Sequence, residues 1–193
     1  MTGLDAIRQL VAVAGEAPIV ASLGHPAYDL FAAGDRPANF YTWGSMGLAS
    51  SIGLGIAVAQ PNRRVYVLDG DGSLLMNLGS LATIGWIRPA NLVLVVLDNE
   101  RYATTGGQDT ATAHGADLDA AGRAMGLKTA TVCSVDALSE VLGRIANATE
   151  PWMIVAKIRA STPTAKPPLD CVFIKQRFMA AIGCAEAATT GTR

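Results

Sequence analysis

Two short segments with carboxylate and amide side chains could together hold a cation. Asp69-Gly70-Asp71-Gly72-Ser73 follows the apolar run Val65–Leu68, and Asn99 follows the apolar run Leu92–Leu97. Mg²⁺ prefers oxygen ligands and usually keeps water and substrate phosphate among them. If the two runs are neighbouring parallel strands, Asp71 and Asn99 project into one crevice beyond their carboxyl ends. These residues therefore predict a magnesium site that is completed by diphosphate oxygens.

The glycines of the first segment also suit a phosphate group. Gly70 and Gly72 would let the backbone approach a ligand closely. A helix that begins near Ser73 would present free N–H groups and the positive end of its dipole to the same ligand. Asp-Gly-Asp-Gly is also common in ordinary turns, so a purely structural turn is the alternative for this segment alone.

Strands and helices that could position these residues alternate along the chain. Four apolar runs predict strands that are covered on both faces: Ile19–Ser22, Val65–Leu68, Leu92–Leu97 and Trp152–Ile158. Four other segments have helical patterns: Met46–Ala59, Ser73–Ile84, Ala137–Ile145 and Val172–Ile182. The alternation predicts an α/β three-layer sandwich with a central parallel sheet. We expect residues 1–184 to form a single domain and residues 185–193 to form a flexible tail.

The composition narrows the class of protein. Half of the 193 residues are hydrophobic, which excludes a disordered chain, and Lys plus Arg (15) nearly balance Asp plus Glu (16). This balance leaves no electrostatic footprint for nucleic acid or an anionic membrane. The longest apolar stretch, Met46–Ala59, is too short for a membrane span of ~20 residues. Residues 1–20 have no signal-peptide pattern and the three cysteines are scattered, so we expect a reducing, cytoplasmic compartment.

The order of these motifs resembles that of thiamine-diphosphate enzymes. The metal–diphosphate motif of that family is Gly-Asp-Gly followed, one strand–helix–strand unit later, by Asn, and the match here runs from Gly70 to Asn99. The resemblance implies that Mg²⁺ is held by Asp71, Asn99 and the main-chain oxygen of Arg101. It also implies further contacts with the cofactor from Gly70, Gly72, Ser73, Tyr102 and Ala103. Family members often have Asn-Asn where this chain has Asp98-Asn99, so only the position before the ligand departs from the pattern.

A second segment, Trp43-Gly44-Ser45-Met46-Gly47, resembles the part of these enzymes that embraces the aminopyrimidine ring. By resemblance, the Gly44 carbonyl accepts a hydrogen bond from the amino group of the ring, and Ser45 belongs to the same contact. Met46 would wedge under the cofactor and force its bent conformation, which makes Met46 a candidate catalytic residue. A flexible methionine suits such irregular contact. The alternative is a core methionine early in a helix.

A third segment, Gly24-His25-Pro26, ends the first predicted strand and resembles a loop that contacts the diphosphate. Gly24 and His25 are therefore candidate cofactor-binding residues. His25 is also a candidate catalytic residue, since it could donate a hydrogen bond to the diphosphate or reach the substrate. The alternative is a loop histidine without either role.

The polar stretch Thr104–Gly115, which contains His114, is long for a connection between two elements. Long loops of this kind often carry function. Three of its residues could close over the cofactor or bind an anionic substrate head: Thr105, Gly106 and Gln108. A solvated loop is the alternative.

Most of the chain resembles sulfopyruvate and phosphonopyruvate decarboxylases. The matching segments are Asn39-Phe40-Tyr41, Gly44–Gly55, Asp69–Ala82, Asn91–Asn99, Thr105–Thr110 and Pro167–Phe178. In that family the glutamate that activates the pyrimidine ring lies on a separate pyrimidine-binding domain, and the acidic residues here show no such motif. The resemblance implies the diphosphate-binding (beta) subunit of a split hetero-oligomer. It would decarboxylate a small 2-oxo acid only together with a pyrimidine-binding (alpha) subunit.

Other functions stay open from the sequence. An acyloin-forming carboligase, similar to acetohydroxyacid synthase, would trap the product with a second carbonyl compound. A subunit of a 2-oxoacid:ferredoxin oxidoreductase would often carry clustered cysteines, and those of this chain are not clustered. A non-catalytic module of the same fold and a plain nucleotide-binding α/β domain are the two alternatives without thiamine-diphosphate turnover.

Overall fold

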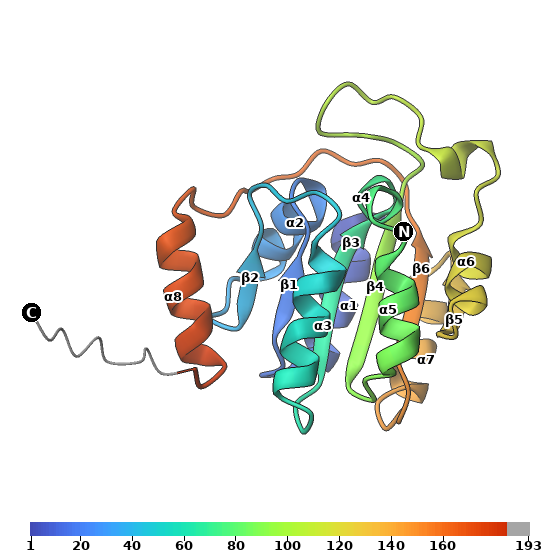
Figure 1. The fold of residues 1–193 in the computed structure, drawn as a ribbon. Helices are drawn as coiled ribbons and strands as arrows, with labels where there is room; N and C mark the ends of the chain where they lie inside the picture. The colour runs from blue at the N-terminus through green and yellow to red at the C-terminus, as the bar shows by residue number, and fades with distance from the viewer. Residues whose placement is uncertain (185–193) are drawn as a thin grey trace, which may run out of the picture.

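A six-stranded parallel sheet forms the centre of the computed structural model, which describes residues 1–184 (Figure 1). Its strands are β1 (Ile19–Ala21), β2 (Asn39–Tyr41), β3 (Val65–Gly70), β4 (Leu92–Asp98), β5 (Lys128–Val132) and β6 (Trp152–Lys157). They lie in the order β2-β1-β3-β4-β6-β5, and every neighbouring pair is parallel. The prediction of an α/β fold with a central parallel sheet is confirmed.

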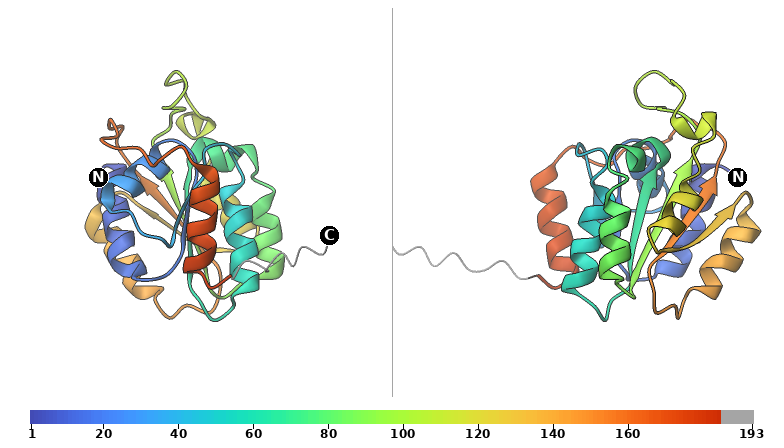
Figure 2. Two further views of the ribbon diagram at one scale, coloured as in Figure 1. Left: turned by 90° about the vertical axis from the view of Figure 1, so that its left-hand side faces the viewer. Right: turned by 45° about the vertical axis from the view of Figure 1, so that its right-hand side comes forward.

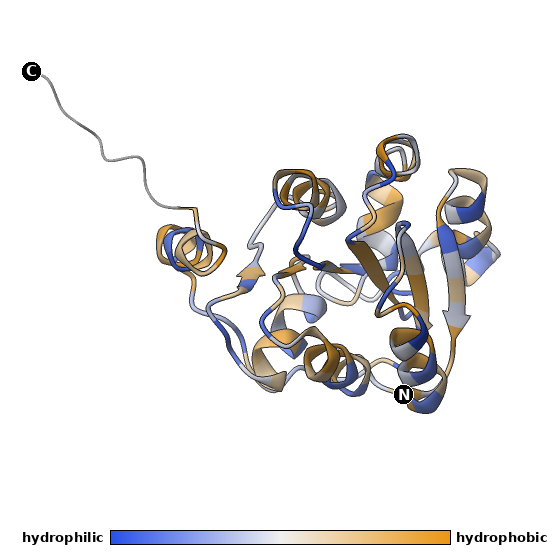
Figure 3. Cartoon of the chain, turned by 90° about the horizontal axis from the view of Figure 1, so that it is seen from below, coloured by the Kyte–Doolittle hydropathy of each residue, from blue (hydrophilic) through white to orange (hydrophobic). Residues whose placement is uncertain are grey.

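Helices cover both faces of this sheet (Figure 3). One face packs against α1 (Gly3–Ala14), α2 (His25–Ala33) and α7 (Val135–Arg144). The other packs against α3 (Ala49–Ala59), α4 (Asp71–Met76), α5 (Ser80–Ile87) and α6 (Leu118–Ala124). Every residue of β4 is buried, as expected for a strand between two layers of helices. The last helix, α8 (Cys171–Ala181), stands beside the edge strand β2 (Figure 2).

The helices differ in whether a side chain caps the N-terminus. A side chain caps α1, α6, α7 and α8; the capping residues are Thr2, Asp117, Ser134 and Asp170. Helices α2 and α4 begin directly beyond β1 and β3 with a glycine at the cap position, and neither has a side-chain cap among the described residues. Apart from Pro26, which has no N–H, their first residues have backbone donors that no capping side chain engages.

The structure corrects two of the predicted helices. Ser73–Ile84 is not one helix, because the chain breaks between α4 and α5 at Asn77, whose side-chain amide donates to the Gly47 carbonyl at 3.0 Å. The helix predicted from Met46 begins only at Ala49, because Ser45 and Gly47 have left-handed backbone angles (φ 61° and 88°).

Among the described residues, six elements were not predicted from the sequence: α1, α2, β2, the 3-10 helix η1 (Ala111–His114), α6 and β5. The edge strand β5 is only partly buried, so it carries no continuous apolar run. The predicted tail at 185–193 lies outside the described residues. Within residues 1–184, no helix is both long enough and apolar enough to cross a membrane.

Candidate functional site

A pocket opens where the carboxyl ends of β1, β3 and β4 meet. Most of the predicted site residues line it: His25, Met46, Gly70, Asp71, Gly72, Ser73, Asn99, Arg101, Tyr102 and Ala103. Gly24, Gly44 and Ser45 are outside the lining, although each is next to or near a lining residue in sequence. Residues from three separate motifs thus share one crevice at the carboxyl edge of the sheet, where open α/β sheets bind ligands.

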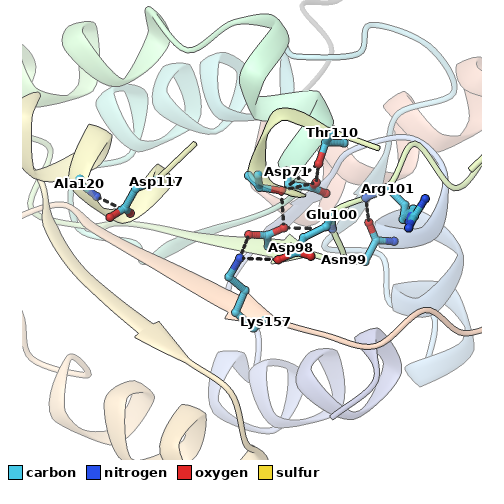
Figure 4. A network of polar contacts seen from close by, with 10 residues as sticks. Asp71, Asp98, Asn99, Glu100, Arg101, Thr110, Asp117, Ala120 and Lys157 are labelled. Carbon is cyan, nitrogen blue, oxygen red and sulfur yellow. Dashed lines mark hydrogen bonds and ion pairs between the residues drawn. The ribbon is translucent and has the colours of Figure 1, made fainter. Parts of the chain in front are cut away.

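Asp71 begins α4 and is 2% exposed. The Thr110 hydroxyl donates to its Oδ2 atom (Figure 4). The Thr112 hydroxyl lies 3.2 Å from the same atom, so Oδ1 is not engaged by either. Burial raises the pKa of Asp71 above its ordinary value; the Thr110 hydroxyl opposes this effect and the nearby carboxylate of Asp98 adds to it. A divalent cation would supply the positive charge that favours the ionised form of this carboxylate.

The other two expected metal ligands lie in the turn that follows β4. The side-chain oxygen of Asn99 accepts a hydrogen bond from the Arg101 backbone N–H at 3.0 Å, which closes the turn around Glu100 (φ 62°). The guanidinium of Arg101 instead contacts Asp109 and the Gly107 carbonyl. This arrangement is compatible with a role for the Arg101 main chain alone.

The chemistry of these donors matches Mg²⁺ bound together with a phosphate ligand. In the described part of the chain, no three His, Cys, Asp or Glu side chains form a group that could hold a metal ion. A cation here would need oxygen atoms from Asp71, from the amide and carbonyl of the turn, and from a bound ligand. Mg²⁺ is commonly held in that way, by one or two carboxylates plus substrate phosphates and water.

Two glycines beside the pocket have no room for a side chain. A Cβ atom on Gly72 would lie 2.4 Å from Tyr102 Cε1 and 3.1 Å from Thr110 Cγ2. A Cβ atom on Gly24 would lie 2.7 Å from Thr104 Cγ2, and Gly24 also has a left-handed φ of 79°. A side chain at either position would displace Tyr102 or Thr104, which line the pocket. Bare glycine backbone beside two helix starts without side-chain caps fits a bound diphosphate.

The segment Trp43–Gly47 is tied to α4 by hydrogen bonds. Ser73 Oγ accepts from the Gly47 backbone N–H and pairs with Ser22 Oγ, both at 2.9 Å. Met46 is half-buried, lines the pocket and precedes α3, so it is not a core methionine within a helix. Because Ser73 contacts both parts, the expected ring-binding segment and the expected diphosphate-binding segment form one connected wall.

His25 is the first residue of α2 and not part of a loop, which removes the alternative of a loop histidine. Burial lowers the pKa of His25 below its ordinary value and so favours the neutral ring, which carries one N–H donor. The ring lies 6.5 Å from that of Tyr28, which lies 5.9 Å from that of Trp43. These aromatic side chains connect α2 with the Trp43–Gly47 segment beside the pocket.

The stretch Thr104–Gly115 rises beyond the carboxyl end of the sheet (Figure 2) and ends in the 3-10 helix η1 (Ala111–His114). Thr104 and Thr105 line the pocket, whereas Gly106 and Gln108 do not. His114 is paired with Asp109 at 3.2 Å and is also outside the lining. The expected closure over a ligand is thus limited in this structure to the start of the stretch.

Sequence reasoning missed three polar residues at or beside this site. Thr110 and Thr112 hold Asp71 from loop positions that show no recognisable pattern. Asp29 lines the pocket from α2, is 4% exposed, and has a pKa that burial raises to about 6. Proline is common in the first turn of a helix, and Pro26 could have indicated that a helix begins here. Such a helix would have placed Asp29 one turn from its start, close to the predicted site.

Comparison with known proteins places this geometry in a family. Residues 27–156 match the family model described as "Thiamine pyrophosphate enzyme, C-terminal TPP binding domain". The chain belongs to this thiamine pyrophosphate enzyme family. The matched range includes the predicted metal residues Asp71, Asn99 and Arg101.

Similar proteins agree with this membership. The sulfopyruvate decarboxylase subunit beta of Methanocaldococcus jannaschii is 41% identical over 181 residues, which are 93% of this chain and 96% of that protein. The phosphonopyruvate decarboxylase of Streptomyces viridochromogenes is 37% identical over 97% of this chain but only 48% of its own length. A solved structure of a putative thiamin diphosphate-dependent enzyme from Mycobacterium smegmatis superposes with a TM-score of 0.74 at 27% identity, covering 83% of this chain and 32% of that one. The predicted resemblance to thiamine-diphosphate decarboxylases is confirmed.

Proposed function

We propose that this chain is the diphosphate-binding (beta) subunit of a thiamine-diphosphate-dependent decarboxylase acting on a small 2-oxo acid that resembles sulfopyruvate or phosphonopyruvate. The observation that carries the proposal is the joint position of Asp71, Asn99 and the Arg101 turn between two uncapped helix starts. The similarity along nearly the whole length of a sulfopyruvate decarboxylase subunit beta supports the reaction class.

The metal and the diphosphate would share the pocket. Mg²⁺ would be held by Asp71, the Asn99 side-chain oxygen and the Arg101 main-chain oxygen, together with ligand oxygens and water. The N–H groups at the starts of α2 and α4 would bind the diphosphate, with seven residues around it: Gly24, His25, Gly70, Gly72, Ser73, Tyr102 and Ala103. The neutral His25 ring could donate its single N–H to a phosphate oxygen or to the substrate.

The ring end of the cofactor would contact the Trp43–Gly47 segment. In this proposal Gly44 offers its carbonyl to the pyrimidine amino group, Ser45 belongs to the same contact, and Met46 supports the bent conformation of the cofactor. Thiamine diphosphate, when bound, supplies the electron sink for loss of carbon dioxide from a 2-oxo acid. The contribution of this chain is to bind the cofactor, to orient it through Met46 and to hold the metal.

A separate alpha subunit with the pyrimidine-binding domain and its activating glutamate is part of the proposal. Two observations support it: the relative of matching length is itself named a subunit beta, and this chain spans about half of the phosphonopyruvate decarboxylase it resembles. The assembly would be a hetero-oligomer.

The cysteines Cys133, Cys171 and Cys184 are free and exposed, which suits the reducing cytoplasm.

Binding of thiamine diphosphate by Asp71→Ala and wild-type chains, with Mg²⁺ and with EDTA, tests the proposal. We expect wild-type binding to require the metal and Asp71→Ala to lose it, with an unchanged circular dichroism spectrum. Asp136→Ala, on the exposed side of α7, is the control and should bind as the wild type does. Equal affinity of Asp71→Ala and wild type would exclude the metal assignment.

The substrate and the partner need a second experiment. Mild affinity purification of the chain from its native host, followed by mass spectrometry, should recover a stoichiometric second chain together with thiamine diphosphate. Incubation of that complex with sulfopyruvate, phosphonopyruvate and pyruvate should yield an aldehyde from one of the first two. An acyloin product from pyruvate would instead indicate a carboligase.

A further inference from the structure

A second buried carboxylate, that of Asp98, lies directly behind the metal site. Asp98 ends β4 and is 2% exposed. The hydroxyl of Thr112 lies between the two carboxylates, 2.9 Å from Asp98 Oδ1 and 3.2 Å from Asp71 Oδ2. Two carboxylates held this close together in a buried place repel each other when no positive charge lies beside them. The site therefore needs a positive charge near Asp98 as well as one near Asp71.

Lys157 supplies that charge from the neighbouring strand. The register of the sheet pairs Asp98 of β4 with Lys157 of β6, and Lys157 Nζ lies 2.7 Å from Asp98 Oδ2. Lys157 is outside the pocket lining. It therefore does not touch a ligand in the pocket, but it contacts Asp98, which is next to the lining residue Asn99 in sequence.

The same ammonium group also reaches the turn that carries the metal ligands. Lys157 Nζ is 3.2 Å from Glu100 Oε1, and the Glu100 backbone N–H donates to Asp98 Oδ1 at 3.1 Å. Glu100 has the left-handed φ of 62° that lets the chain reverse between Asn99 and Arg101. Lys157 thus contacts both sides of the turn on which Asn99 lies.

We propose that Lys157 is a positioning residue for the metal site: it offsets the charge of Asp98 and holds the turn 98–101 in the shape that presents Asn99 and the Arg101 carbonyl to Mg²⁺. This inference rests on the proposed function. An exposed ion pair would contribute little, but Asp98 is buried, and removal of its partner leaves an uncompensated charge beside Asp71. The turn would relieve that repulsion by moving Asp98, and Asn99 would move with it.

A calorimetric titration with Mg²⁺ tests the role of Lys157. It uses the full chain, in the complex in which it is purified, at saturating thiamine diphosphate. We expect Lys157→Met to weaken Mg²⁺ binding by ~10–100-fold, the range typical for loss of a residue that supports a metal ligand. Lys128→Met is the matched control, because Lys128 also lies on a strand and pairs with a carboxylate, Glu150 at 3.9 Å, at the opposite end of the sheet. It should bind Mg²⁺ as the wild type does.

A double variant separates this role from a general effect on the fold. Asp98→Asn keeps one side-chain oxygen, which can accept from both Thr112 and the Glu100 N–H, but removes the charge. Asp98→Asn/Lys157→Met should therefore bind Mg²⁺ as tightly as Asp98→Asn alone. Glu100→Gln, at a half-exposed side chain, weakens only the contact of Lys157 with the turn and should cost several-fold in affinity. It keeps the test decisive if Lys157→Met does not fold.

Three results would overturn the inference: unchanged Mg²⁺ affinity in Lys157→Met, no recovery in the double variant, or an unfolded Lys157→Met beside an unaffected Glu100→Gln. Failure of the proposed function looks different. In that case the wild-type chain itself would show no Mg²⁺-dependent binding of thiamine diphosphate, and the positioning role would fall with it.

Discussion

A Cβ atom on Gly72 would stand 2.4 Å from the Tyr102 ring, so the first turn of α4 meets the turn after β4 with no room for a side chain. Tyr102 is half-buried and lines the pocket. The sequence pattern suggested that the glycine lets backbone approach a ligand. In the structure it also lets an aromatic ring approach the backbone, and that ring forms a wall of the pocket.

Gly72→Ala should displace the Tyr102 ring and weaken binding of thiamine diphosphate by ~10-fold or more, equivalent to ~1.4 kcal/mol. The fold should survive, because the ring is half-exposed and can move. Gly79→Ala is the matched control, since Gly79 has a helical φ of −60° and no heavy atom within 4 Å of an added Cβ. It should bind the cofactor normally and gain ~0.4–1 kcal/mol of stability. Wild-type affinity in Gly72→Ala would contradict the fit of this wall to the cofactor.

Thr112→Val tests the hydroxyl that lies between Asp71 and Asp98. The substitution keeps the shape of the side chain but removes the single O–H donor that lies within reach of both buried carboxylates. We expect a loss of stability of ~1–3 kcal/mol and weaker Mg²⁺ binding. Urea unfolding of the ligand-free chain and Mg²⁺ titration measure the two effects. A variant with normal stability and normal affinity would show that this hydroxyl is dispensable.

Thr129→Val should change stability in the opposite direction to Thr112→Val and serves as its comparison. The Thr129 hydroxyl is buried and has no hydrogen-bond partner in the described part of the chain. Its removal should raise the free energy of unfolding by ~1 kcal/mol, because an unpaired polar group is replaced by a methyl group. Thr129 is in β5, away from the pocket, so cofactor binding should not change. A loss of stability would indicate an unseen partner for the hydroxyl.

The strands that are buried on both faces of the sheet could be predicted from the sequence alone. The strands β3 and β4 are apolar along almost their whole length, and the polar residues that follow them mark the carboxyl edge of the sheet. Asp71 and Asn99 could be placed together for this reason. The edge strand β5 could not be found, because solvent on one side allows Lys128 and Thr131 within it.

Contacts between distant loops had no sequence signal. Thr110 and Asp71 are 39 positions apart, and a threonine in a polar loop looks the same whether or not its hydroxyl holds a carboxylate. The break at Asn77 has the same origin, since its partner is the Gly47 carbonyl, 30 positions away. Such contacts depend on how the loops pack at the sheet edge, and local periodicity does not encode that packing.

The buried carboxyl of Asp29 predicts a pH dependence of stability. Burial raises the pKa of Asp29 from 3.8 to about 6, so the folded chain binds its proton more tightly than the unfolded chain does. The group is neutral in both states well below pH 4. As pH rises from about 4 to about 6, the folded state loses stability relative to the unfolded state, by up to ~3 kcal/mol.

Asp29→Asn removes this titration. The variant should be more stable than the wild type at pH 7 to 8, by up to ~3 kcal/mol, and the difference should close as pH falls through 6 toward 4. Chemical unfolding of both ligand-free chains across this range measures the difference. A constant difference in stability at every pH would mean that the Asp29 pKa is not raised in the folded state.

Met46 offers a prediction that separates binding from catalysis. Its side chain is half-buried at the pocket, in a turn that Ser73 and Asn77 fix through Gly47. If Met46 supports the reactive shape of the cofactor, Met46→Ala in the assembled enzyme should lower kcat by ~10-fold or more and change cofactor affinity far less. Met46→Leu should retain more activity, because it keeps most of the volume. Met125→Ala, at the end of α6 outside the pocket lining, is the control. Equal losses in kcat and in cofactor affinity would indicate that Met46 only binds, and wild-type turnover would reject the supporting role.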